Sequence, residues 1–133
     1  LQPVPLCMNE VASGFEKMFV GINGRAIDFA KLGWLYLHDG HNGAAQVVSS
    51  DFVAQATRND VDTDPASQYQ YLWWLDEQRP GTFFANGDHC RQIYVDPGAE
   101  LVIVRHGSRC GDVDWIDLMG ELADWLEPQL GEP

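Results

Sequence analysis

The stretch GDHCRQIYVDP at residues 87–97, followed closely by LVIVR at residues 101–105, decides the fold of this chain. Two runs rich in β-branched and aromatic residues flank Pro97-Gly98-Ala99, which favours a tight connection. We therefore predict that the two runs pair as an antiparallel hairpin. A turn that begins at Gly87 precedes the hairpin and presents His89 at the mouth of a sheet edge, where ladder hydrogen bonds would hold a functional side chain rigidly.

Two shorter segments upstream of the hairpin are also typical of strands. Residues 71–75 are aromatic and apolar, and residues 83–85 form a second short apolar run. Together with the hairpin strands 92–96 and 101–105, they predict a meander of about three to four antiparallel strands. Because helical segments lie before and after these strands, we expect an α+β fold in which helices flank a small antiparallel sheet.

Two helices are expected before the sheet. Apolar residues recur at helical spacing over residues 25–37, and Asn23 is placed to cap the first turn. Gly33 interrupts this pattern, and a close neighbour would explain a glycine there. Ser49 or Ser50 is expected to cap a shorter helix that runs through residue 56.

The last predicted helix begins after Asp112 or Asp114, because either carboxylate can cap its positive end. We expect Pro128 to stop this helix. Its predicted apolar face consists of Trp115, Leu118, Met119, Leu122 and Leu126. We divide the chain into an irregular lead-in at 1–20, one folded region at 21–128 and a tail at 129–133.

Composition excludes several functional classes. The 133 residues include 45% hydrophobic residues, which suffices for one packed domain. With 20 acidic and 8 basic residues, the net charge of −12 argues against binding to nucleic acids or anionic membranes. No apolar run approaches the length of a transmembrane helix. Neither the composition nor the number of cysteines identifies the cellular compartment.

The three cysteines, Cys7, Cys90 and Cys110, are too few for a disulfide scaffold. If Gln92 pairs near Arg105, Cys90 and Cys110 lie just beyond the open end of the hairpin. A disulfide between them is then favoured, provided that the geometry allows it. The alternative is a zinc site that adds His89 and His106, but the ligand spacing of a structural site is missing, so we expect no metal.

Four landmarks in order resemble the C-terminal part of the serine β-lactamase-like hydrolases. They are GINGRAIDFAKLG at 21–33, QVV and SDFV within 46–53, YQYLWW at 69–74, and the stretch from 87 to 105 with its trailing GDVDW. The similar branch is class C, which includes esterases, D-aminopeptidases, penicillin-binding proteins and 6-aminohexanoate-dimer hydrolases. The resemblance covers roughly residues 14 to 127.

The resemblance implies an acyl-enzyme mechanism on an amide or ester, without a cofactor. A serine in a Ser-x-x-Lys motif attacks the acyl group, while a lysine and a tyrosine handle protons. In the 6-aminohexanoate-dimer hydrolase branch, a third motif, Gly-Ile-His-Gly-Gln, lines the pocket. Gly87 and His89 match this motif, whereas Cys90 and Arg91 replace its second glycine and its glutamine. The four residues are therefore the expected wall of a substrate pocket, and Arg91 is a candidate contact for a substrate carboxylate.

No catalytic residue of the family is found in this chain. The serines each lack a lysine three residues later: Ser13, Ser49, Ser50, Ser67 and Ser108. Our leading hypothesis is therefore a C-terminal fragment of a longer hydrolase, inactive alone, which acts on a small amide or ester substrate only in the full-length protein. The alternative is a non-catalytic module that keeps the fold and binds a protein or a small ligand. A fragment would expose an apolar face, so we also expect self-association.

Two further patterns carry less weight. Arg105-His106-Gly107 after a strand is similar to the motif of histidine phosphatases, but no later histidine completes the pair. Asp60, Asp62 and Asp64 alternate as in a calcium loop, yet no glycine and glutamate follow at the required spacing. We therefore expect a strand end and a solvated loop.

Overall fold

The computed structural model describes residues 22–59 and 67–130, so the predicted lead-in at 1–20 and the aspartates 60, 62 and 64 lie outside the described residues. These described residues form three α-helices, five strands and one short 3₁₀ turn. In chain order these are α1 (Ala26–Leu37), α2 (Ser50–Ala56), β1 (Tyr69–Gln70), β2 (Trp73–Leu75), β3 (Phe83–Gly87), η1 (Asp88–Cys90), β4 (Arg91–Asp96), β5 (Leu101–Arg105) and α3 (Trp115–Leu130).

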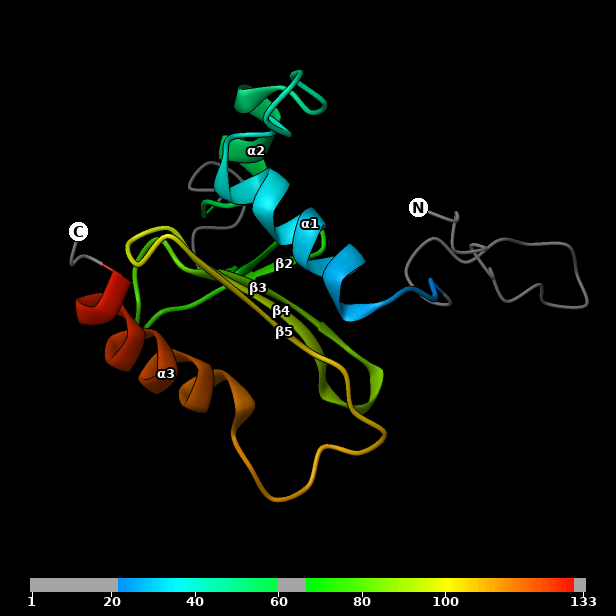
Figure 1. The fold of residues 1–133 in the computed structure, drawn as a ribbon, viewed down its shortest axis with the longest axis vertical. Coiled ribbons are helices and arrows are strands. Elements are labelled where there is room, and N and C mark those ends of the chain that lie inside the picture. Colours follow the sequence, from blue (N-terminus) through cyan, green and yellow to red (C-terminus); the bar gives the residue numbers. More distant parts are fainter. Residues whose placement is uncertain (1–21, 60–66, 131–133) are drawn as a thin grey trace, which may run out of the picture.

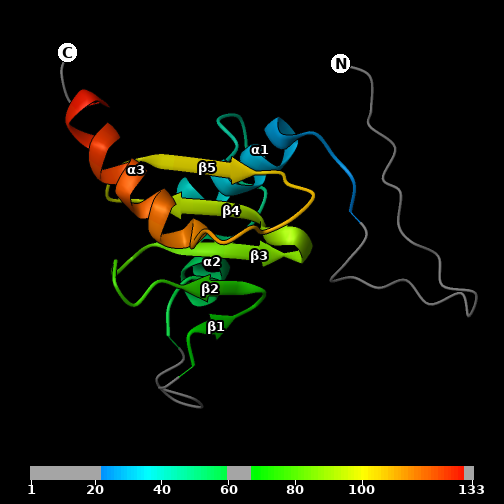
Figure 2. The same ribbon diagram turned by 90° about the horizontal axis from the view of Figure 1, so that it is seen from below.

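The five strands form one antiparallel sheet in the order β1-β2-β3-β4-β5. Helices α1 and α3 lie on opposite faces of this sheet (Figure 1), and α3 runs diagonally across one face (Figure 2). The α+β prediction is therefore confirmed. The expected count of three to four strands is corrected to five, because Tyr71 and Leu72 adopt positive φ values of 43° and 74° and turn the chain between β1 and β2.

The predicted hairpin forms as expected. Strands β4 and β5 pair with Gln92 opposite Arg105 and with Asp96 opposite Leu101. A second hairpin joins β3 to β4, with Gly87 opposite Arg91. The turn that contains His89 therefore links two paired strands.

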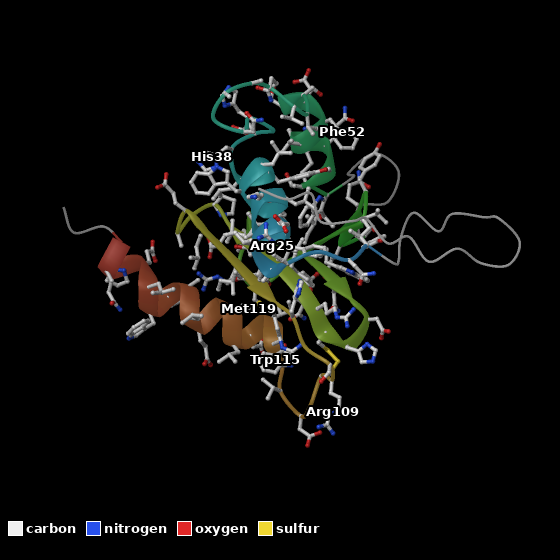
Figure 3. The ribbon with its side chains drawn as sticks, turned by 45° about the vertical axis from the view of Figure 1, so that its right-hand side comes forward. Arg25, His38, Phe52, Arg109, Trp115 and Met119 are labelled. Carbon is white, nitrogen blue, oxygen red and sulfur yellow. A yellow bond between two sulfur atoms is a disulfide. The ribbon has the colours of Figure 1, made fainter. Side chains whose placement is uncertain are left out.

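Alternation along β4 divides the core between the two faces of the sheet. Ile93 and Val95 belong to the cluster that packs with α1, whereas Tyr94 packs with Met119 and Ala123 of α3. Figure 3 shows Met119 on the side of α3 that faces the sheet.

Gly33 is the point where α1 approaches the sheet most closely. A Cβ atom at this position would lie 2.6 Å from Val102 Cγ1 and 2.9 Å from Ile93 Cγ2. Any side chain would therefore push the helix away, which confirms the predicted reason for a glycine at this position.

The helix ends agree with the sequence in part. Ser49 caps α2 by accepting from the backbone N–H of Phe52, and Asp114 caps α3 by accepting from Ile116 and Asp117. Helix α1 begins after Arg25 instead of Asn23, because the carboxylate of Asp28 accepts from the Arg25 backbone N–H at 3.4 Å and from its Nε at 3.0 Å. This pair holds the pKa of Asp28 down to about 2.

Helix α3 differs from its prediction in two respects. Pro128 lies inside the helix, which continues to Leu130, and the carbonyl of Trp125 accepts from the side chain of Gln129. The buried face contains Met119 and Ala123, whereas Leu118 and Leu122 of the predicted apolar face are exposed. Small residues on the inner face allow α3 to lie close to the sheet, which rotates the larger side chains outward.

None of the described helices is long and apolar enough to cross a membrane.

Candidate functional site

The turn between β3 and β4 holds the four residues that the sequence singles out. Gly87 is extended, with φ −106° and ψ 176°, so its backbone does not require glycine. The left-handed conformation falls instead on His89 and Cys90, with φ values of 59° and 54°. Because L-residues reach this region at a cost of about 1–2 kcal/mol, something must hold Cys90 there.

A disulfide holds that position. Cys90 is bonded to Cys110 across a sequence separation of 20, with 5.1 Å between the two Cα atoms. The bond ties the turn to the segment that precedes α3, and Figure 3 shows it in yellow beside Arg109. It also removes two ligands from the zinc site considered as the alternative. Within the described ranges, no group of three or more His, Cys, Asp or Glu residues is placed to hold a metal ion.

Arg105 fixes the backbone of the turn from β5. Its Nη1 donates to the carbonyl oxygens of His89, at 3.0 Å, and of Cys90, while its Nη2 donates to the carbonyl of Arg109 at 2.8 Å. The guanidinium lies 3.8 Å from the ring centroid of Trp115. One side chain thus joins the turn, the segment after β5 and the first residue of α3.

Two neighbours of Arg105 complete this arrangement. Trp115 Nε1 donates to the carbonyl of Cys110 at 2.6 Å, so the disulfide is anchored on both sides. A Cβ atom on Gly107 would lie 2.5 Å from Arg105 Nη1, so a side chain there would displace the guanidinium from these contacts.

The side chains of His89 and Arg91 extend from this rigid backbone. The imidazole Nδ1 lies 3.0 Å from Asp88 Oδ2, and the His89 side chain is 48% exposed. Arg91 Nε donates to the carbonyl of Gly107 at 3.3 Å and stays at the surface. Both side chains are therefore oriented by neighbours yet open to solvent.

A hollow of about 370 Å³ lies beside the turn on the α3 face of the sheet. Among the four predicted site residues, Cys90 lines it, and Gly87, His89 and Arg91 do not. The lining also includes Trp74, Phe84, Asn86, Gln92, Val113, Asp114, Trp115 and Ile116. The four residues therefore lie close together in the turn, but they do not surround one cavity.

Asn86 and Gln92 in this hollow are polar residues that the sequence interpretation missed. Gln92 is 5% exposed, and its Nε2 donates to Asn86 Oδ1 at 3.3 Å, while its Oε1 has no partner in the described residues. Their paired positions on β3 and β4 put both amides on one face of the sheet. Strand alternation alone could have identified them, because each shares a face with an aromatic residue two positions away.

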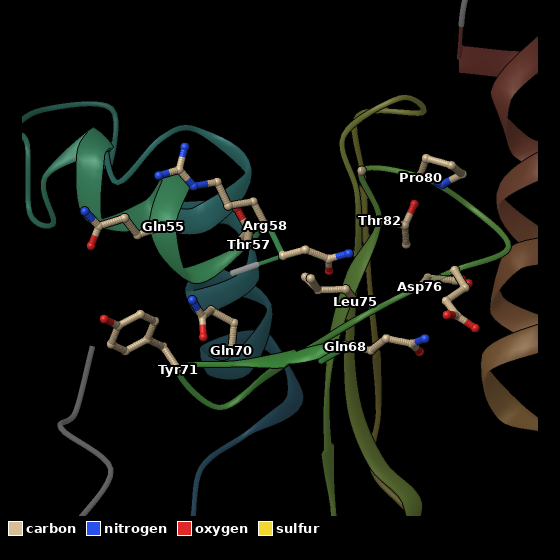
Figure 4. A pocket seen from close by; sticks show the side chains of 13 residues that line it. Gln55, Thr57, Arg58, Gln68, Gln70, Tyr71, Leu75, Asp76, Pro80 and Thr82 are labelled. Carbon is tan, nitrogen blue, oxygen red and sulfur yellow. The ribbon is translucent and has the colours of Figure 1, made fainter. Parts of the chain in front are cut away.

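A larger hollow lies elsewhere, between the end of α2, the β1–β2 turn and the β2–β3 connection (Figure 4). It measures about 1120 Å³ and is lined by mixed side chains that include Arg58, Gln70, Tyr71 and Asp76. None of the predicted site residues reaches it.

The turn from Gly87 to Arg91 offers an imidazole, a guanidinium and a fixed backbone. It contains no serine, no threonine and no free thiol. Such a set can bind and orient a carbonyl or a carboxylate, but it lacks a nucleophile for acyl transfer.

Comparison with known proteins identifies a related fold. No family model matches the chain. A solved structure described as "Putative 6-aminohexanoate-dimer hydrolase from Bacillus anthracis" is similar over 88% of this chain, with a TM-score of 0.74 and 24% sequence identity. The match covers 33% of that protein, so this chain spans about a third of its length. The two proteins share this part of their fold.

Proposed function

We propose that this chain is the C-terminal part of a β-lactamase-like serine hydrolase and forms one wall of its acyl pocket. The observation that carries the proposal is the shared fold with a protein described as a 6-aminohexanoate-dimer hydrolase, over 88% of this chain. The chain corresponds to a third of that protein, and it contains no Ser-x-x-Lys. The nucleophile, the lysine and the tyrosine would then come from the remaining two thirds of such a domain.

The geometry of the turn supports this role for His89. The imidazole is half exposed, Asp88 orients its ring through Nδ1, and Arg105 fixes its backbone carbonyl. A group held in this way is preorganised to donate or accept a hydrogen bond at a substrate carbonyl. We assign His89 to the pocket wall and not to the proton transfers, which the resemblance gives to the lysine and the tyrosine.

Arg91 and Cys90 would set what the pocket accepts. Arg91 donates through Nε to the carbonyl of Gly107, which leaves its two Nη atoms available to bind a substrate carboxylate. Cys90 stands where the related motif has glycine, and the disulfide at this position narrows the approach to the strand. We therefore expect a small amide or ester with a carboxylate at one end.

An ester assay tests the proposal. The purified chain should not hydrolyse a fluorogenic short-chain ester, whereas the longer protein from the same reading frame should do so through an acyl-enzyme. In the longer protein, His89→Ala should lower kcat/KM by about tenfold to a hundredfold, because the transition state loses the hydrogen bond between the imidazole and the substrate carbonyl. Arg91→Gln should raise KM for substrates that carry a carboxylate and spare those without one.

His41→Ala is the matched control. His41 is also an exposed histidine in a turn, where its Nδ1 accepts from the backbone N–H of Gly43 at 3.0 Å. Its loss should leave kcat/KM unchanged. Serine-dependent turnover by the 133 residues alone would refute the fragment hypothesis, and equal activity of the His89 and His41 variants would remove His89 from the pocket. A chain that binds a ligand or a protein without any hydrolase partner would favour the non-catalytic module instead.

A further inference from the structure

Neighbours among the described residues hold every polar atom of His89 except Nε2. The backbone N–H donates to Asp88 Oδ1 at 2.9 Å, and the carbonyl oxygen accepts from Arg105 Nη1 at 3.0 Å. The ring atom Nδ1 lies 3.0 Å from Asp88 Oδ2. Since the side chain is 48% exposed, Nε2 is the atom that remains for a substrate.

The carboxylate of Asp88 uses both of its oxygens on His89, one on the backbone and one on the ring. Because Arg105 holds the His89 carbonyl at the same time, the carboxylate keeps the imidazole in one orientation. Asp88 stands where the related motif has isoleucine, a side chain that cannot accept a hydrogen bond. The contact between the carboxylate and the ring is therefore a feature of this chain's own sequence.

A carboxylate beside a ring nitrogen decides where the imidazole keeps its proton. An ionised carboxylate only accepts hydrogen bonds, so the nitrogen that faces it must carry a hydrogen. In neutral His89 this nitrogen is Nδ1, and Nε2 then bears only a lone pair. Neutral His89 can thus accept a hydrogen bond from a substrate, but it cannot donate one. A second proton, on Nε2, turns the same atom into a donor.

His41 has the opposite arrangement in the same fold. Its Nδ1 accepts from the backbone N–H of Gly43 at 3.0 Å, so this nitrogen carries no proton in the neutral ring. The single proton of neutral His41 therefore lies on Nε2. Two exposed histidines in turns of one chain are thus expected to hold opposite neutral forms.

Positive charges also lie around the turn. Arg105, Arg91 and Arg109 bring them from β5, from β4 and from the segment after β5. These guanidinium groups oppose a second proton on His89, whereas the negative charge of Asp88 favours it. Among the described residues, Asp88 is the one polar contact of the ring, so it decides which nitrogen holds the first proton.

We propose that Asp88 is a positioning residue that keeps the first proton of His89 on Nδ1, so that the imidazole donates to a substrate carbonyl only when it is doubly protonated. This role rests on the proposed function, in which the imidazole contacts a substrate carbonyl. It adds the atom that makes the contact, Nε2, and the charge state in which the contact forms. The contribution of His89 to hydrolysis should therefore be present at low pH and lost as the pH rises through the titration of the ring.

Nitrogen-15 NMR of the histidine rings tests the position of the proton, in the 133-residue chain and, with selective labelling of histidine, in the longer protein. A ring nitrogen that carries a proton resonates far upfield of one that does not, and His89→Ala and His41→Ala assign the signals. In the neutral rings we expect the proton on Nδ1 of His89 and on Nε2 of His41. Asp88→Asn should shift the His89 proton toward Nε2, because an amide can face the ring with either a donor or an acceptor.

The pH dependence of hydrolysis in the longer protein tests the charge state. The measured quantity is kcat/KM for a neutral short-chain ester, divided by that of His89→Ala at the same pH, so that the titration of the shared lysine and tyrosine cancels. The ratio should be about ten to a hundred on the acid side and approach one on the alkaline side. In the Asp88→Asn background it should stay above one on the alkaline side, because the neutral ring can then carry its proton on Nε2.

Asp51→Asn is the matched control, because it removes an exposed carboxylate from the first turn of α2. It should leave both the spectrum and the pH dependence unchanged, and circular dichroism of each variant verifies that it is folded. A proton on Nε2 of neutral His89, or a spectrum that Asp88→Asn leaves unchanged, would overturn the proposal. So would a ratio above one that does not change with pH, or the same pH dependence with and without the Asp88 carboxylate. A ratio of one at every pH would instead overturn the proposed function, and the spectrum alone would then decide where the proton lies.

Discussion

Removing the disulfide tests the most unusual feature of the turn, a left-handed cysteine where the related motif has glycine. Two double variants are needed, Cys90→Ser with Cys110→Ser and Cys90→Gly with Cys110→Ser. Both lose the crosslink, but only the second relieves the left-handed backbone, whose φ at Cys90 is 54°. Comparison of the two separates the crosslink from the backbone strain.

The structure gives the magnitude of each contribution. Closing a loop with the sequence separation of 20 restricts the unfolded chain by about 3 kcal/mol. Glycine at a left-handed position is more stable than an L-residue by about 1 kcal/mol, after its larger loss of backbone entropy is subtracted. The serine pair should therefore lose about 3 kcal/mol of unfolding free energy, and the glycine pair about 2 kcal/mol.

Urea denaturation followed by tryptophan fluorescence measures both differences. Since Trp115 donates to the carbonyl of Cys110, its fluorescence should respond to changes at the disulfide. The measurements need the same low protein concentration throughout, because association would stabilise the folded state. Equal stability of the two double variants would refute the claim that Cys90 is strained. A loss below about 1 kcal/mol in both would refute the stabilising role of the crosslink.

Three further predictions concern the sheet and its helices. Gly33→Ala should destabilise the protein by about 1–2 kcal/mol in urea denaturation, because the clash of its Cβ atom, 2.6 Å from Val102 Cγ1, outweighs the gain in helix propensity. Gly120→Ala should be neutral or slightly stabilising, because its Cβ atom meets only the flexible side chain of Arg79 at 3.2 Å. A destabilising effect no larger at Gly33 than at Gly120 would contradict this reasoning. Arg79→Gln should lower the free energy of unfolding by about 2–3 kcal/mol, because it leaves the buried carboxylate of Asp96 without its ion pair. Asp124→Asn should lower it by less than about 1 kcal/mol, because the Asp124 side chain is 64% exposed. The reverse order in thermal unfolding would refute the claim that Asp96 is the more important partner of Arg79. Burial raises the pKa of Tyr94 from 10.0 to about 12, so the unfolded state loses the phenol proton first, and the free energy of unfolding should fall as the pH rises from about 10 to about 12. In Tyr94→Phe the free energy of unfolding should fall less steeply over this pH range. An unchanged slope would contradict the raised pKa of Tyr94.

The hairpin was predictable because its information is local. Alternating apolar residues on either side of a proline–glycine connection fixed both strands, and the register of Gln92 opposite Arg105 follows. That register also brought Cys90 and Cys110 within bonding distance, as the sequence suggested. Ser49 and Asp114 were predictable caps for the same reason.

The differences arose where distant contacts decide the structure. The outward rotation of Leu118 and Leu122 depends on how closely α3 approaches the sheet, which periodicity alone does not specify. The turn at Tyr71 and Leu72 lacks glycine, so no local signal marks it. The role of Arg105 was missed because its partners are backbone carbonyls, two of them 15 and 16 residues away.

The coding sequence upstream of Leu1 decides whether these 133 residues are the end of a serine hydrolase. We predict an in-frame Ser-x-x-Lys, followed by a tyrosine, in a continuous reading frame that leads into the 133 residues. The protein expressed from that frame should form an acyl-enzyme on the serine. A start codon at or near Leu1, with no such motif before it, would contradict the assignment to a serine hydrolase and favour a non-catalytic module.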